Sequence, residues 1–242
     1  MRSLSIVIPA YNEEKRLPAT LERVVSFLQK SAFQPFEVIV VDDGSRDGTA
    51  EVARAAGARH PEIRLLQNPG NRGKGYSVRH GMLDAGHDWV LFSDADLSAP
   101  IEEIDKLFDA IDRASAAVAI GSRALDRSLI GDHQSIFREF AGRFFNITVQ
   151  LGAGLRFWDT QCGFKLFRRD AAQTVFERLR LFRFGFDVEA LFIARKHGFK
   201  TVEVPVRWNH VEGTKVNMFS DSLDMFLDIA RVRLNQIRGR YK

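Results

Sequence analysis

The sequence is poor in cysteine and lacks any long apolar run. Its 242 residues include a single cysteine, Cys162, which excludes an internal disulfide and a thiolate metal cluster and favours a reducing compartment. No run approaches the roughly 18 apolar residues of a membrane-spanning helix, so no such helix is expected. The N-terminal segment MRSLSIVIPAYNEE is not predicted to be a signal peptide, because a proline and acidic residues end its short apolar run.

Linkers, low-complexity tracts and internal repeats are also missing, so no domain boundary is visible. With 45% hydrophobic and 27% charged residues the composition is that of a globular protein, and one domain over residues 1–242 is expected. The net charge of +4 suits an anionic substrate or a membrane surface, and equally a solvated basic surface. Nothing indicates nucleic acid as a partner.

Apolar runs typical of strands alternate with segments of helical periodicity. In segment 17–28, for example, Leu17, Leu21, Val24 and Leu28 recur at the spacing of one helix face. Such alternation predicts an α/β fold with a doubly wound parallel sheet, in which ligands bind beyond the carboxyl ends of the strands. The expected strands are 4–10, 36–45 with a turn at its end, 63–68, 89–96, 117–123 and 201–208, and the expected helices are 17–28, 49–56, 76–85, 186–198 and an amphipathic segment at 220–238.

Polar clusters follow the first four predicted strands. They are Tyr11–Glu13, Asp42–Ser45, Asn71–Gly75 and Asp94–Asp96. Each cluster alone is compatible with ordinary turns, since Asp, Asn, Gly and Ser favour them. Four clusters at the expected ligand edge together favour a binding site.

The stretch WVLFSDADLSAP sets two carboxylates two residues apart, which in a continuous strand places them on the same side. A Mg²⁺ or Mn²⁺ ion between Asp94 and Asp96 would relieve their repulsion. The alternative is that an aspartate caps the following helix, although Ser98 could do this alone. The glycine-rich stretch GNRGKGYS is not a P-loop, because Gly75 follows Lys74, and it is not a dinucleotide fingerprint, because Val78 replaces the third glycine.

The second half is less regular. The segment 117–123 is predicted to be a strand that ends on Arg123. Segment 135–157 mixes phenylalanines with Arg138 and Arg143, which fits either ordinary core or an amphipathic element at a lipid interface. The segment 159–170, DTQCGFKLFRRD, is expected to be compact without an assigned secondary structure.

The ordered motifs IPAYNEE, VDDGSRDGT, NRGKG and DAD resemble those of family 2 GT-A glycosyltransferases. GSR, DTQCGFK, FDVE and WNHVEGTK extend the resemblance almost end to end, toward the polyprenyl-phosphate glycosyltransferases. The resemblance implies a GT-A fold, a single Rossmann-like, mostly parallel sheet flanked by helices. It also implies a nucleotide-binding half (1–97) and an acceptor-binding half (98–242) that ends in an amphipathic helix.

The resemblance further implies a nucleotide-sugar donor, a divalent metal, a polyprenyl or dolichyl monophosphate acceptor and inversion at the anomeric carbon. Asp94, Asp96 and Arg123 would be the catalytic residues, with Asp94 and Asp96 holding Mg²⁺ or Mn²⁺ and Asp94 also touching the nucleotide. The other implied contacts are Pro9, Tyr11, Glu13, Asp42 and Asp43 with the base and ribose, Lys74 and Lys215 with the diphosphate, and Arg123 and Arg138 with the acceptor phosphate.

The motifs WNHVEGTK, NRGKG and DTQCGFKLF look closer to dolichyl-phosphate glucosyltransferases than to the mannose synthases, which favours UDP-glucose as the donor. GDP-mannose is the alternative, although Asn209 stands where mannose enzymes usually carry arginine and Ser98 replaces a glutamine metal ligand. A non-catalytic sugar-nucleotide or lipid-binding module and a nucleotidyltransferase are the alternatives of other classes. The expected location is the cytoplasm, peripheral at the cytoplasmic face of a membrane or recruited there by a membrane partner.

Overall fold

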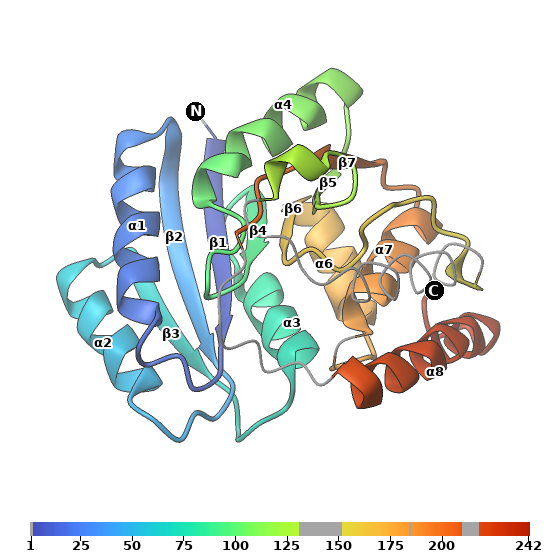
Figure 1. The fold of residues 1–242 in the computed structure, drawn as a ribbon, viewed down its shortest axis with the longest axis horizontal. Helices are drawn as coiled ribbons and strands as arrows, with labels where there is room; N and C mark the ends of the chain where they lie inside the picture. Colours follow the sequence, from blue (N-terminus) through green and yellow to red (C-terminus); the bar gives the residue numbers. More distant parts are fainter. Residues whose placement is uncertain (1, 131–151, 184, 210–217) are drawn as a thin grey trace.

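A computed structural model describes residues 2–130, 152–183, 185–209 and 218–242 of the chain (Figure 1). Arg138, Lys215 and most of the phenylalanine-rich segment 135–157 lie outside the described residues. The strands are β1 (Arg2–Ala10), β2 (Phe33–Asp42), β3 (Ile63–Gln67), β4 (Trp89–Ser93), β5 (Val118–Ser122), β6 (Phe164–Arg168) and β7 (Thr201–Pro205). The helices are α1 (Leu17–Lys30), α2 (Thr49–Arg59), α3 (Lys74–Asp84), η1 (Ile101–Glu103), α4 (Ile104–Ala114), η2 (Arg127–Leu129), α6 (Arg169–Arg178), α7 (Phe186–Lys196) and α8 (Met218–Ile237).

The seven strands form one sheet in the order β3-β2-β1-β4-β6-β5-β7. Neighbours pair in parallel except at β6, which is antiparallel to both β4 and β5. The predicted α/β class and mostly parallel sheet are therefore confirmed. Strands from residues 2–93 and from residues 118–205 meet directly, because β4 pairs with β6.

Helices cover both faces of the sheet because the strands are apolar on both sides. In β2, Val38 and Val40 pack toward α1, α2 and α4, whereas Ile39 and Val41 pack toward α3. The second face continues through α6, α7 and α8 at the other end of the sheet (Figure 1). The result is a helix–sheet–helix sandwich, with the loops at the strand ends free to carry polar residues.

The structure corrects several sequence expectations. The segment 159–170 was expected to be compact, and it contains β6, a central strand that was not predicted. The fourth strand was expected to reach Asp96, but β4 ends at Ser93, and the strand expected to end at residue 208 ends at Pro205.

The predicted C-terminal helix is confirmed as α8. Ile229 and Val232 are buried, whereas Leu227, Leu234 and Ile237 are exposed. Among the described residues, no helix combines the length and the apolar character needed to cross a bilayer.

Candidate active site

The edge formed by the carboxyl ends of β1 and β4 is a switch point of the sheet. From β1 the chain moves outward through β2 and β3, and then returns to place β4 on the other side of β1. Ligands of open α/β sheets bind outside the strand ends at such a point. Because β6 runs antiparallel, the residues that precede it reach the same edge as those that follow β4 and β5.

The loops after β1 and β2 brace each other at this edge. The Asn12 amide donates to Ser45 Oγ over 2.9 Å, and Asn12 Oδ1 accepts from the Arg46 amide over 2.8 Å. The Glu13 amide donates to Thr49 Oγ1 over 2.8 Å. These cross-links fix the backbone that carries Tyr11 and Glu13 beside the end of β2.

Asp42 and Asp43 are both buried at the end of β2 and have different hydrogen-bond partners. Asp42 accepts from the Ser45 amide over 3.1 Å, within its own turn. Asp43 accepts from the amides of Arg72 and Gly73 over 2.9 and 2.8 Å. Asp43 thus holds the loop that leads into α3. Pro9, another predicted donor-site residue, lies within β1 opposite Val41 of β2.

This loop positions Lys74 at the switch point. Gly73 has a φ of +98°, and a Cβ there would lie 2.5 Å from the Phe182 carbonyl oxygen, so only glycine fits. Lys74, the first residue of α3, places its Nζ 2.6 Å from Asp94 Oδ1. Burial would lower the pKa of Lys74, but the negative charges of Asp94 and Asp187 outweigh it and raise the pKa. The ammonium therefore stays charged at neutral pH.

Asp94 and Asp96 lie in a turn after β4, so the strand alternation expected for them was wrong. The Asp94 amide donates to the Gly163 carbonyl, and the turn closes with Leu97 at a φ of +46°. Asp96 Oδ1 accepts from the Ser98 amide over 2.9 Å. Asp96 therefore stabilises the backbone turn here, while Ser98 makes no side-chain cap at the start of η1.

A buried ion pair that was not predicted lies beside Lys74 and Asp94. Lys165 on β6 is 1% exposed and pairs with Asp187 at the start of α7. Burial raises the pKa of the Asp187 carboxyl, which the charges of Lys165 and Lys74 only partly offset. A lysine inside the apolar stretch GFKLF is the signal that could have located this pair, because a buried charge needs a partner.

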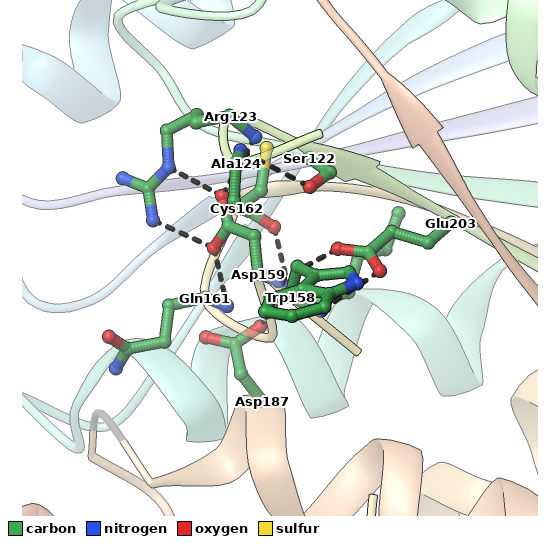
Figure 2. A network of polar contacts seen from close by, with 10 residues as sticks. Ser122, Arg123, Ala124, Trp158, Asp159, Gln161, Cys162, Asp187 and Glu203 are labelled. Carbon is green, nitrogen blue, oxygen red and sulfur yellow. Dashed lines mark hydrogen bonds and ion pairs between the residues drawn. The ribbon is translucent and has the colours of Figure 1, made fainter. Parts of the chain in front are cut away.

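Arg123 follows β5 and is held by a second acid that was not predicted, Asp159 (Figure 2). Its Nε and Nη2 donate to the two carboxylate oxygens of Asp159 over 2.6 and 2.9 Å. Burial would raise the pKa of Asp159, but the Arg123 charge and hydrogen bonds prevail and lower it to about 2. The neighbouring Cys162 thiol is buried, which raises its pKa to about 12 and makes it a poor nucleophile at neutral pH.

The predicted residues Lys74, Asp94, Asp96 and Arg123 therefore gather at one edge, together with the unpredicted Asp159, Lys165 and Asp187. This alternation of cations and carboxylates can bind phosphate groups together with a divalent cation. Two carboxylates and no sulfur or imidazole ligand suit Mg²⁺ or Mn²⁺. In the described part of the chain, no three histidine, cysteine or acidic side chains are grouped to hold a metal. The residues present fit a metal whose coordination is completed by a bound diphosphate.

The chain is similar in sequence to a known family of enzymes. The sequence model of the family "Glycosyl transferase family 2" matches residues 5–176. The chain is 40% identical over 251 residues to the dolichyl-phosphate beta-glucosyltransferase of Drosophila melanogaster, covering 99% of this chain and 77% of that protein. It is 37% identical over 256 residues to the human dolichyl-phosphate beta-glucosyltransferase, covering 100% of this chain and 78% of that protein.

Solved structures share the fold at low sequence identity. Glucosyl-3-phosphoglycerate synthase from Mycobacterium tuberculosis, solved with Mn²⁺, UDP-glucose and phosphoglyceric acid, superposes with a TM-score of 0.67 at 18% identity, covering 96% of this chain and 79% of that one. Mannosyl-3-phosphoglycerate synthase from Rubrobacter xylanophilus gives a TM-score of 0.64 at 18% identity, covering 99% of this chain and 75% of that one. With a family match over most of its length and close relatives along its full length, the chain belongs to glycosyl transferase family 2.

Proposed function

We propose that this protein transfers glucose from UDP-glucose to a polyprenyl or dolichyl monophosphate, with inversion at the anomeric carbon. The observation that carries the proposal is the similarity, at 36–40% identity over 99–100% of this chain and 76–78% of the relatives, to dolichyl-phosphate beta-glucosyltransferases of fly, slime mould and human. The cluster of cations and carboxylates at the switch point supports it, because both substrates bring phosphate groups that need neutralising.

The donor is expected to bind over the first half of the sheet. Pro9, Tyr11, Glu13 and Asp42 line the ends of β1 and β2, which suits them to contact base and ribose. Asp43 would act indirectly, by holding the loop in front of α3. Lys74 would then contact the diphosphate, and Lys215, outside the described residues, is proposed to assist it.

Asp94 and Asp96 are proposed to hold Mg²⁺ or Mn²⁺ together with the donor diphosphate. The bound ion would supply positive charge that stabilises the departing diphosphate. In the structure the Lys74 ammonium lies against Asp94, so this carboxylate already accepts a cationic partner. Asp96 would have to turn one oxygen from the Ser98 amide or use its second oxygen.

The acceptor is expected to approach Arg123, with Arg138, outside the described residues, as its second cation. A phosphate monoester has a second pKa of about 6, so its oxygen is already a nucleophile at neutral pH and needs no general base. The phosphate oxygen forms a bond to the anomeric carbon while the bond from that carbon to the diphosphate oxygen breaks. UDP leaves as the other product.

A lipid phosphate presents its charged end at a bilayer surface, so the reaction must take place there. We place it at the cytoplasmic face, where the protein would bind peripherally or through a membrane partner. Residues 98–242 would form the acceptor-binding half of a single domain.

The test is a matrix of donors, metals and variants with a short polyprenyl phosphate as acceptor. Transfer of glucose from UDP-glucose, lost with EDTA and restored by Mg²⁺ or Mn²⁺, is expected. Transfer from GDP-mannose alone would identify a mannosyltransferase, and binding of UDP-glucose without turnover would identify a non-catalytic module.

Asp96→Asn keeps an oxygen for the Ser98 amide and removes only the charge. We expect turnover to fall by about 100-fold or more, with unchanged thermal unfolding. Asp88→Asn is the matched control, since Asp88 is exposed and precedes the same strand at the opposite edge of the sheet. Equal activity in the two variants would contradict the metal-binding role.

A further inference from the structure

The guanidinium of Arg123 is held along one edge by Asp159, and within the described residues no hydrogen bond is made by its other edge. Asp159 accepts from Nε and Nη2, and its Oδ2 also accepts from the Arg123 backbone amide over 3.0 Å. The centroid of the Trp208 ring lies 4.8 Å from Arg123 Cζ. Since guanidinium carries five N–H donors in a planar fork, the edge formed by its two terminal nitrogens can still donate two bonds to a phosphate.

The position of Asp159 depends in turn on Glu203. Glu203 lies on β7 opposite Ile120 of β5, and its two carboxylate oxygens accept from the consecutive amides of Trp158 and Asp159, over 2.9 and 2.7 Å (Figure 2). The Ser122 hydroxyl, at the end of β5, also bonds to Glu203. One carboxylate therefore ties the turn before β6 to the strand that carries Arg123.

Backbone groups in this turn need hydrogen-bond partners, because most of the turn beyond its first residue is buried. Trp158 is 61% exposed, but Asp159, Thr160 and Cys162 are buried. Two charge-assisted hydrogen bonds from adjacent amides are strong and directional, and they fix both the position and the tilt of the turn. Removing one of them would let the Asp159 carboxylate, and with it the guanidinium, change orientation.

From these contacts we propose that Glu203 and Asp159 are positioning residues that orient Arg123 toward the acceptor phosphate. The proposal rests on the function proposed above. It goes further because it makes the affinity for the acceptor depend on the Glu203 carboxylate. This carboxylate lies on β7, the edge strand of the sheet, and is not itself expected to contact either substrate.

The test combines an observation of Arg123 itself with steady-state kinetics. Glu203→Gln keeps the size of the side chain but sets an NH₂ group against one of the two amides. In ¹H–¹⁵N spectra of the arginine Nε–H groups, with the Arg123 signal assigned through Arg123→Lys, we expect this signal to shift and exchange faster in Glu203→Gln. In the transfer assay, KM for a short polyprenyl phosphate should rise about 5- to 20-fold, with KM for the donor within about twofold of wild type. Asp159→Asn should show the same pattern more strongly.

Glu37→Gln is the matched control. Glu37 is also a strand glutamate that accepts from a backbone amide, of Gly86, and from a serine hydroxyl, of Ser5, but it lies away from the switch point. Glu37 also pairs with Arg64 over 2.7 Å, so Glu37→Gln should lose at least as much thermal stability as Glu203→Gln without changing the acceptor KM.

An unchanged Arg123 signal in Glu203→Gln, or a rise in acceptor KM of equal size in Glu37→Gln, would overturn the proposal. If the Arg123 signal shifts in Glu203→Gln but the wild-type protein transfers no sugar to polyprenyl phosphate, the result supports the positioning of Arg123 by Glu203 and contradicts the proposed function.

Discussion

Replacing Gly163 by alanine should displace Asp94 without changing the charge of the site. Gly163 precedes β6, and a Cβ built there would lie 2.0 Å from Asp94 Oδ2 and 2.4 Å from its Cγ. Real Cβ contacts essentially never fall below 3.0 Å, so the carboxylate must move by at least about 1 Å. Gly163 does not have a positive φ, and the three atoms nearest to the added Cβ all belong to the Asp94 side chain.

The Gly163→Ala substitution should therefore reduce enzymatic activity more than it reduces thermal stability. A short carboxylate side chain can rotate away at little energy, so the melting temperature should fall by only a few degrees, equivalent to about 1 kcal/mol. Displacement of a reacting or metal-holding group by about 1 Å can reduce the rate by about 100-fold. The assays are Mn²⁺ binding by electron paramagnetic resonance in the presence of UDP, steady-state turnover, and thermal unfolding of the same preparation.

Gly86→Ala is the matched control, because its Cβ would only approach Glu37 Oε1 at 3.4 Å. It should behave as wild type in all three measurements. Should Gly163→Ala bind Mn²⁺ and turn over like wild type, the reasoning that places Asp94 at the metal and the donor would be refuted.

Three further predictions concern buried polar groups. Lys165→Met leaves the Asp187 carboxyl buried without its partner, so urea denaturation should show a loss of about 3–5 kcal/mol. Folding lowers the pKa of Asp159 from 3.8 to about 2, so this carboxyl contributes stability above pH 3.8 that is lost as the pH falls toward 2. The loss amounts to about 2 kcal/mol in the free energy of unfolding, and it should be absent from the acid unfolding curve of Asp159→Asn. Tyr241→Phe removes the hydroxyl that donates to the fully buried Glu189, and differential scanning calorimetry should show about 1–3 kcal/mol of destabilisation with unchanged substrate KM values.

The strands β1 to β4 and the helices α1 to α3 could be predicted from the sequence, because apolar runs alternate there with segments of helical spacing, whereas α4 and α6 were not among the expected helices. Apolar runs mark β1 to β4, and the spacing of Leu17, Leu21 and Leu28 marks α1. Polar clusters after these strands then located the ligand edge, since parallel strands bring their carboxyl ends together.

The antiparallel strand β6 could not be predicted in this way. Its lysine interrupts the apolar pattern, and the stabilising partner of that lysine, Asp187, lies 22 residues further along the chain. The end of β4 was missed for a local reason. Asp94 and Asp96 bond within a turn, as aspartates commonly do, and this preference outweighed the continuation of the strand.

Arg123 was located by sequence reasoning, but its supports were not. Asp159 is 36 residues away from Arg123, and Glu203 is 44 residues beyond Asp159. Only the insertion of β6 beside β5, and the pairing of β5 with β7, brings these side chains together. A single sequence carries no signal for such pairings.

The reversed direction of β6 also bears on how relatives could diverge. The chain leaves the sheet after Ser122 of β5 and returns to it at Phe164 of β6, so the segment between them is anchored at both ends beside the switch point. Insertions or substitutions in that segment would change this edge of the molecule without altering a single strand pairing. Relatives could therefore differ at this edge while the strand order of the sheet stays the same.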